Sequence, residues 1–140
     1  MAEFITVPLQ TVEANQNILF TDTTVCGTNS IMHRNGSGLV TLRGITNQCR
    51  ARFRVTFGAN IAISEGGTVE PISVAITLNG EPVASTIMTV TPAAVEEFFN
   101  VSRTLYLDVP AGCCVQVGVR NINTQAIDVE NASLIVERVA

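Results

Sequence analysis

Three arginines at alternate positions, Arg50, Arg52 and Arg54, have the spacing that most clearly implies chemistry in this chain. The positions between them in residues 49–57 are all apolar. Because successive side chains of a β-strand point to opposite faces, this run predicts a strand with a core face and a cationic face. A guanidinium group pairs with a carboxylate or phosphate through two parallel hydrogen bonds, so the row needs water, an anion or a protein partner.

Few other side chains offer catalytic chemistry. His33 is the single histidine, which excludes a metal site of several histidines within one chain. A serine–histidine–acid triad would have to use His33, and no serine lies in a Gly-x-Ser-x-Gly turn. The chain has no lysine for a Schiff base, and Glu96 and Glu97 would diverge on a strand. We therefore expect no enzyme, cofactor or metal site, and a solvent-exposed loop around His33.

Composition indicates one folded domain, residues 1–140, that assembles with other subunits. The chain is 46% hydrophobic but only 14% charged, below the usual quarter, so we expect other subunits to cover part of its surface. All eight cations are arginine. The formal net charge of −4 argues against nucleic acid or an anionic membrane as partner.

The chain's beginning and its cysteines bear on the compartment. Met1 is not followed by a basic region and an apolar run, so we expect synthesis in the cytoplasm without a signal peptide. Cys26 and Cys49 could bridge, but free thiols are expected in a reducing compartment. Of the adjacent pair, Cys113 is expected in the core and Cys114 on the opposite face.

The patterning that must position these groups is nearly all β. Asn79 and Gly80 form the strongest hairpin signal. Residues 1–14 are expected as an N-terminal arm or edge strand, since Pro8 cannot donate to a central ladder. Helix is expected only within residues 92–97, at most about one turn. The expected strands are residues 5–9, 17–24, 30–34, 38–44, 49–63 with a bulge or bend at Gly58, 72–78, 83–90, 98–109, 115–119 and 132–139.

The arginine face has three interpretations. It can be a solvated face that pairs loosely with cross-strand acids. It can be a subunit interface where the arginines oppose carboxylates such as Asp22, Glu130 or Glu137. It can also bind an anionic ligand. The low charge of the chain favours the interface.

The succession of strands and turns also resembles a known family. The segments that carry the resemblance are ILFT (18–21), GLVTL (38–42), RFRVTF (52–57), ITLNGEPV (76–83), VPAG (109–112) and ASLIV (132–136). Over about residues 15–139 they resemble the jelly roll of tumour necrosis factor and of the globular heads of complement's first component. The tip domains of spore-surface collagen-like glycoproteins and small structural proteins of phages and prophages are similar.

The resemblance implies an all-β jelly-roll sandwich of about ten antiparallel strands that forms a homotrimer. Residues 17–24, residues 132–139 and the arginine strand would face the threefold axis, with Arg50, Arg52 and Arg54 between subunits. Family members at a fibre tip follow a stalk. This chain begins at Met1, which favours a free-standing trimer or one anchored on a larger particle.

The expected function is that of a non-enzymatic, homotrimeric structural or attachment protein of a phage-like particle, such as a capsid decoration or head fibre. It would lie on a virion or bacterial particle surface, with capsid proteins or a host surface glycan as partners. The alternative is a bacterial carbohydrate- or receptor-binding module with ligand-facing loops at residues 28–37 and 64–70. Their candidate residues are His33, Arg34, Asn35 and Glu65. A third class, a small hydrolase, would depend on His33.

Overall fold

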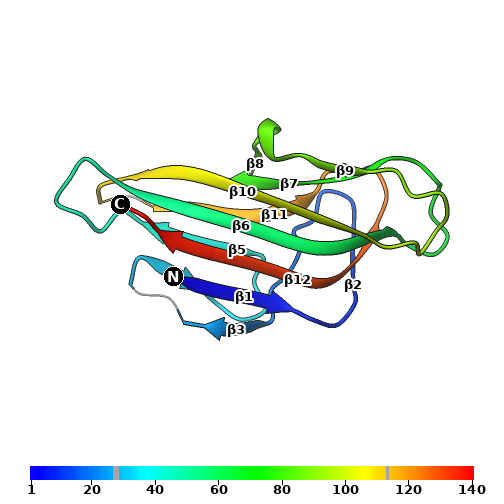
Figure 1. Ribbon diagram of the computed structural model, residues 1–140, viewed down its shortest axis with the longest axis horizontal. Helices are drawn as coiled ribbons and strands as arrows, with labels where there is room; N and C mark the ends of the chain where they lie inside the picture. Colours follow the sequence, from blue (N-terminus) through cyan, green and yellow to red (C-terminus); the bar gives the residue numbers. More distant parts are fainter. Residues whose placement is uncertain (27–28, 113) are drawn as a thin grey trace.

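Two antiparallel sheets packed face to face make up the computed structural model, which describes residues 1–26, 29–112 and 114–140 (Figure 1). Thr28, at the start of one expected ligand-facing loop, and Cys113, expected in the core, lie outside the described residues. The architecture is the predicted all-β sandwich. In the described part of the chain, no helix is long and apolar enough to cross a membrane.

The first sheet holds the arginine strand, β6, next to its edge strand β10. Its order is β10-β6-β12-β1-β3, and β2 also pairs with β12. The strands are β1 (Ala2–Thr6), β2 (Gln10–Val12), β3 (Asp22–Val25), β6 (Arg50–Ile63), β10 (Phe99–Pro110) and β12 (Ile127–Arg138). In Figure 1, β10, β6, β12 and β1 run side by side along the long axis.

The second sheet has the order β4-β5-β11-β7-β8, and β9 also pairs with β7. The strands are β4 (Ile31–His33), β5 (Leu39–Arg43), β7 (Ile72–Leu78), β8 (Glu81–Pro82), β9 (Met88–Val90) and β11 (Cys114–Asn121). Asn79 and Gly80 form the predicted hairpin turn between β7 and β8, both with positive φ.

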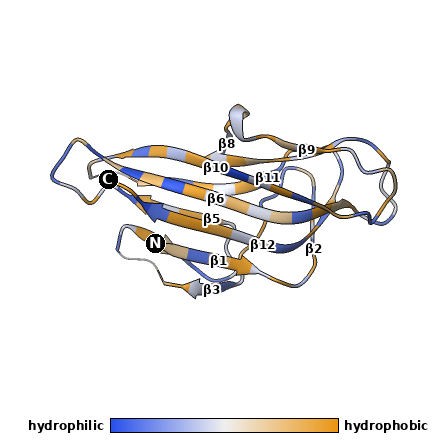
Figure 2. Ribbon diagram, in the orientation of Figure 1, coloured by the Kyte–Doolittle hydropathy of each residue, from blue (hydrophilic) through white to orange (hydrophobic). Residues whose placement is uncertain are grey.

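Period-two alternation along β6 builds the core between the sheets. Ala51, Phe53, Val55 and Phe57 are completely buried, while the arginines between them face outward. Figure 2 shows hydrophilic and hydrophobic bands alternating along this strand. Burying each large apolar side chain contributes about 1.5–3 kcal/mol, which makes the core face of β6 a main source of stability.

The N-terminal segment differs from the expectation of an arm or edge strand. β1 begins at Ala2 rather than at residue 5 and lies between β12 and β3. Pro8 follows the end of β1, where its missing N–H removes no ladder hydrogen bond. Residues 7–9 are also apolar, so the sequence pattern did not show that the strand ends at Thr6.

Residues 17–24 do not form the single strand that was expected. Only β3 (Asp22–Val25) is a strand there, and Ile18 and Phe20 are buried while the chain crosses from one sheet to the other. The backbone N–H of Ile18 donates to Val119 of the second sheet, and that of Thr21 donates to Ile5 of the first. The apolar spacing is therefore correct for burial but not for continuous pairing.

The bulge expected at Gly58 lies in the neighbouring strand. Between Glu130 and Ser133 the register of β12 against β6 shifts, and Asn131 adopts a φ of 51°. Asparagine tolerates this left-handed conformation better than most residues. Gly58 itself continues β6 without interruption.

Helix occurs elsewhere than expected. Residues 92–97 form bends and a turn, with Glu96 at a φ of 61°. A short 3₁₀ helix at Ala84–Thr86 instead interrupts the expected strand 83–90. The buried Thr86 hydroxyl accepts from Ile76 N–H at 3.0 Å and donates to the Val83 carbonyl at 2.7 Å. It thereby replaces a ladder partner for β7 before β9 resumes the pairing.

Candidate functional site

The arginine row lies on the outer face of the first sheet, and two of its members share one carboxylate. Asp108 stands opposite Arg52 in the register of β10 against β6. Its Oδ1 accepts from Arg52 Nε at 2.8 Å, and its Oδ2 accepts from Arg50 Nε at 3.0 Å. The side chains remain 41–48% exposed, so these are surface pairs screened by solvent.

The third arginine is held from both sides. Arg54 stands between Tyr106 of β10 and Glu137 of β12, and its Nη2 donates to Glu137 Oε2. The hydrogen bonds that Arg54 donates, first to Glu137 and second to Tyr106, raise its pKa. Tyr106, the single tyrosine, is 59% exposed.

The same pairing perturbs the Asp108 carboxyl. Its pKa is lowered from the ordinary value, first by the hydrogen bond from Arg52, with the charge of Arg50 adding to the effect. The reciprocal hydrogen bond raises the pKa of Arg52. The carboxylate is therefore ionised throughout the neutral range, and the arginine row is largely balanced within its own chain.

Of the three carboxylates expected opposite the arginines, only Glu137 pairs with one in this chain. Asp22 lies on β3, which β12 and β1 separate from β6. Glu130 stands opposite Asn60, toward the other end of β6. Sequence reasoning missed Asp108, although its outward phase in the predicted strand 98–109 was a usable signal. Pairing across subunits stays a prediction.

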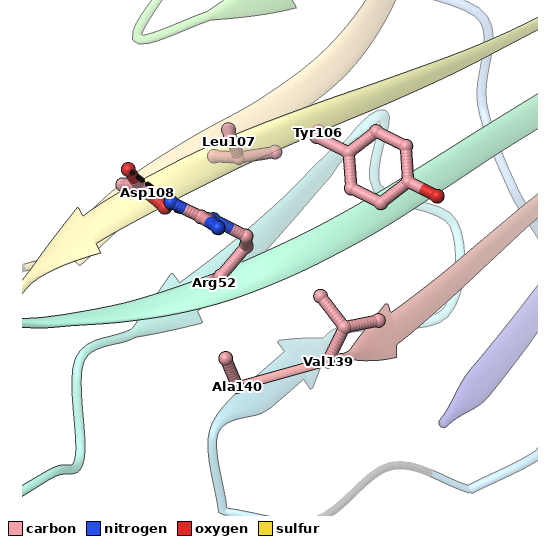
Figure 3. A pocket seen from close by; sticks show the side chains of 6 residues that line it. All are labelled: Arg52, Tyr106, Leu107, Asp108, Val139 and Ala140. Carbon is pink, nitrogen blue, oxygen red and sulfur yellow. Dashed lines mark hydrogen bonds and ion pairs between the residues drawn. The ribbon is translucent and has the colours of Figure 1, made fainter.

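A hollow of about 540 Å³ lies beside the paired charges. Figure 3 shows Arg52 reaching toward Asp108, while the Tyr106 hydroxyl points away from that carboxylate. Val139 and Ala140 line the other side, because the chain end continues the ladder beyond β12: Arg52 N–H donates to the Ala140 carbonyl and Val139 N–H to that of Arg52.

The middle of this outer face is small and uncharged. Gly58 stands between Ser102 of β10 and Ser133 of β12. Two residues earlier along β6, and so on the same face, Thr56 pairs with Thr104. A Cβ added to Gly58 would meet nothing closer than 3.9 Å, so packing within the chain does not require glycine there. We call Thr56, Gly58, Ser102, Thr104 and Ser133 the small-residue face. The row at Gly58 carries the smallest side chains, and Ile135 stands beside Thr56 in the neighbouring row of the same face.

The structure corrects the expectation for His33. The residue belongs to β4 and is half-buried rather than solvent-exposed in a loop, with its ring 4.5 Å from that of Phe4. Its Nε2 lies 2.9 Å from the Ser37 carbonyl, which can only accept, so Nε2 carries a proton. Nδ1 is buried without a hydrogen-bond partner. In the described part of the chain no acid bonds Nδ1 to orient the ring, as a triad would require.

Three of the four candidate ligand-facing residues come together. His33, Arg34 and Asn35 line a second hollow, of about 1030 Å³, beside β4. Glu65 does not line it and is exposed in the loop after β6. Gln125 fixes that loop by bonding both backbone groups of Thr68 at 2.8 Å.

Other reactive groups are scattered. Cys26 and Cys49 carry exposed free thiols. Within residues 1–26, 29–112 and 114–140, no three His, Cys, Asp or Glu side chains are close enough to hold a metal ion.

Solved structures share this architecture. The globular domain of zebrafish complement 1qA protein matches with a TM-score of 0.63 at 10% identity, over 96% of this chain and 94% of that one. The Eiger TNF of S. frugiperda matches with a TM-score of 0.70 at 12% identity, over 99% and 91%. These likenesses confirm the jelly-roll sandwich.

A family 35 carbohydrate-binding module from Clostridium thermocellum aligns over 96% of this chain and 98% of its own, at 13% identity and a TM-score of only 0.38. No family model matches the sequence, and no curated protein sequence matches it.

Proposed function

We propose that this chain is a non-enzymatic jelly-roll module that assembles as a homotrimer through the outer face of its first sheet. The observation that carries the proposal is the small-residue face on β10, β6 and β12. Gly58, Ser102 and Ser133 form an uncharged row, and a Cβ added to Gly58 would meet nothing closer than 3.9 Å within the described chain. Closed symmetric assembly buries such a face against identical copies.

The charged row beside this face supports the same arrangement. Each guanidinium group has five N–H donors. Arg50 donates one hydrogen bond to Asp108 and Arg52 donates two, so both arginines keep donors for carboxylates of a neighbouring copy. Asp22 is the acid we expect there, because it is exposed on β3 at the far margin of the same sheet. Apolar burial would supply affinity, and the charges would fix register.

The module would serve as a structural or attachment component of a phage-like particle, of capsid-decoration or head-fibre type, on a virion or bacterial particle surface. Its support is the resemblance of the sequence segments named above to small phage structural proteins, together with the charged fraction of only 14%, which favours a surface partly covered by other subunits. Capsid proteins would be its partners. Proteomic detection of the chain in purified particles tests this role, and its absence from them would contradict it.

Light scattering on the eluting peak of a size-exclusion column tests the assembly. A trimer has three times the 14.9 kDa chain mass at micromolar concentration. Ser102→Gln adds bulk to the small-residue face and should dissociate it. Ser85→Gln makes the same change on the exposed 3₁₀ helix and should leave it intact. A wild-type monomer, or a Ser102→Gln trimer, would disprove the proposed interface.

A further inference from the structure

The second hollow has an unusual lining for an acidic protein. It extends from the edges of β3 and β4 onto the outer face of β5 and β11. Among the described residues that line it, Arg34 is the single cation and none is Asp or Glu, although acids outnumber arginines 12 to 8 in the chain. The amides of Asn35 and Gln116 and the hydroxyl of Thr41 add neutral hydrogen-bonding groups.

The floor of the hollow is a row across three strands. Met32 stands opposite Thr41 in the register of β4 against β5, and Gln116 stands opposite Thr41 from β11. Met32 is half-exposed, while neither the Thr41 hydroxyl nor the side-chain amide of Gln116 has a hydrogen-bond partner among the described residues; the Gln116 backbone N–H donates to Asn79 Oδ1. The row thus offers one apolar contact followed by two unused polar groups.

Arg34 is presented by a turn with a fixed backbone. Ser37 N–H donates to the Arg34 carbonyl at 2.9 Å, and Gly36 N–H donates to Phe20 at 2.8 Å. His33 fastens the same turn through its bond to Ser37, and Asn35 Oδ1 accepts from Thr23 at 2.9 Å. The Arg34 guanidinium itself forms no ion pair in the described part of the chain. A ligand would meet a cation on an ordered support.

We infer that this hollow binds a carboxylated sugar, such as a uronic or sialic acid residue. One guanidinium balances one carboxylate and can bond it bidentately. Hydroxyl and amide groups around it suit the hydroxyls of a sugar ring. A neutral sugar would lack a stacking platform, because the Phe4 ring is only 2% exposed. A phosphate dianion would be only half balanced by Arg34.

The inference goes beyond the proposed assembly and does not depend on it. The hollow lies at the β3–β4 edge and on the second sheet, away from the small-residue face. Subunit number is measured without sugar, so failure of sugar binding leaves the assembly standing, and failure of assembly leaves the sugar site standing.

Titration of the ¹⁵N-labelled protein, followed by amide chemical shifts, tests the site. The probes are N-acetylneuraminic acid and glucuronic acid at millimolar concentration, with glucose and inorganic phosphate as comparisons. We expect the acid sugars to produce saturable shifts at Met32, Thr41 and Gln116. Loss of a charge-assisted hydrogen bond in Arg34→Gln should weaken binding about tenfold or more.

Arg103→Gln is the matched control, since Arg103 is an exposed arginine on β10 without an ion pair among the described residues. It should bind the acid sugars as the wild type does. Because Arg34 is exposed and forms no ion pair among the described residues, Arg34→Gln should keep the wild-type amide spectrum without ligand. Equal binding of glucose, tighter binding of phosphate, absence of saturable shifts, or full affinity in Arg34→Gln would each overturn the inference.

Discussion

Asp108 accepts a hydrogen bond from Arg52 Nε at 2.8 Å across the pair formed by the edge strand β10 and its neighbour β6. The same carboxylate accepts from Arg50, so one acid joins two positions of the cationic row. The row therefore presents a charge pattern set within each chain before any partner arrives. A binding partner must match that pattern rather than three bare cations.

Stability should fall in acid through Asp108. Its pKa is lower in the folded chain than in the unfolded one, so the unfolded state binds more protons near and below pH 4. The contribution is present above the unfolded pKa and is lost as pH falls through the folded pKa. Asp108→Asn should therefore show a shallower acid limb when urea unfolding is followed at a series of pH values.

Asp22→Asn provides the comparison for this effect. Asp22 is an exposed acid whose side chain contacts no arginine within the described chain. The acid limb of Asp22→Asn should follow that of the wild type, measured on dissociated protein. An Asp108→Asn profile with the wild-type slope would show that the ion pairs do not contribute.

Much of the fold could be predicted because apolar residues alternate with polar ones wherever one face of a strand is buried in the core and the other is exposed to solvent. In β6 the alternation of Ala51, Phe53 and Val55 with arginine specifies both the strand and its outer face. The same periodicity led to the wrong prediction of a strand at residues 17–20. Ile18 and Phe20 are buried by packing between the sheets, not by continuous pairing within one sheet. Periodicity reports burial, and it reports strand pairing only indirectly.

A side-chain hydrogen bond explains the failure at residues 83–90. The Thr86 hydroxyl takes the place of a backbone hydrogen-bond partner of β7. No local pattern in the sequence predicts that role. Thr86→Val keeps the shape but leaves Ile76 N–H and the Val83 carbonyl without this partner. We expect a loss of about 1–3 kcal/mol in the free energy of unfolding, measured with urea. Thr91→Val, at an exposed threonine, should change it by no more than about 0.5 kcal/mol.

The arginine face could be located from sequence, but its partners could not. Alternation placed Arg50, Arg52 and Arg54 on one side of a strand, whereas the choice of Asp108 depends on β10 lying beside β6. Strand order arises from long-range pairing, which short-range patterns do not encode. The prediction of a solvent-exposed His33 was wrong for a related reason, since Phe4 from the distant β1 packs against its ring.

Asn121 should be among the most sensitive polar positions. Its buried side-chain nitrogen donates to the carbonyls of Val12, Glu13 and Gln125 at 3.0–3.2 Å. Asn121→Ala would leave these acceptors without that donor and should cost about 2–4 kcal/mol of unfolding free energy in urea. Asn47→Ala removes the same group from an exposed loop and should cost no more than about 0.5 kcal/mol. Equal losses would contradict a clamping role for Asn121.

Two glycines should respond oppositely to an added methyl group. A Cβ on Gly44 would lie 2.1 Å from the Pro110 carbonyl oxygen, and backbone there cannot yield without disturbing the turn after β10. Gly44→Ala should therefore cost about 1–3 kcal/mol of unfolding free energy. Gly58→Ala meets nothing closer than 3.9 Å and should leave the single chain as stable or slightly more stable, because alanine restricts the unfolded state. Urea unfolding of both variants, compared on dissociated protein, checks the pair. A larger loss at Gly58 would mean that the glycine is required within the chain itself, which would remove the reason for assigning its open space to a second copy.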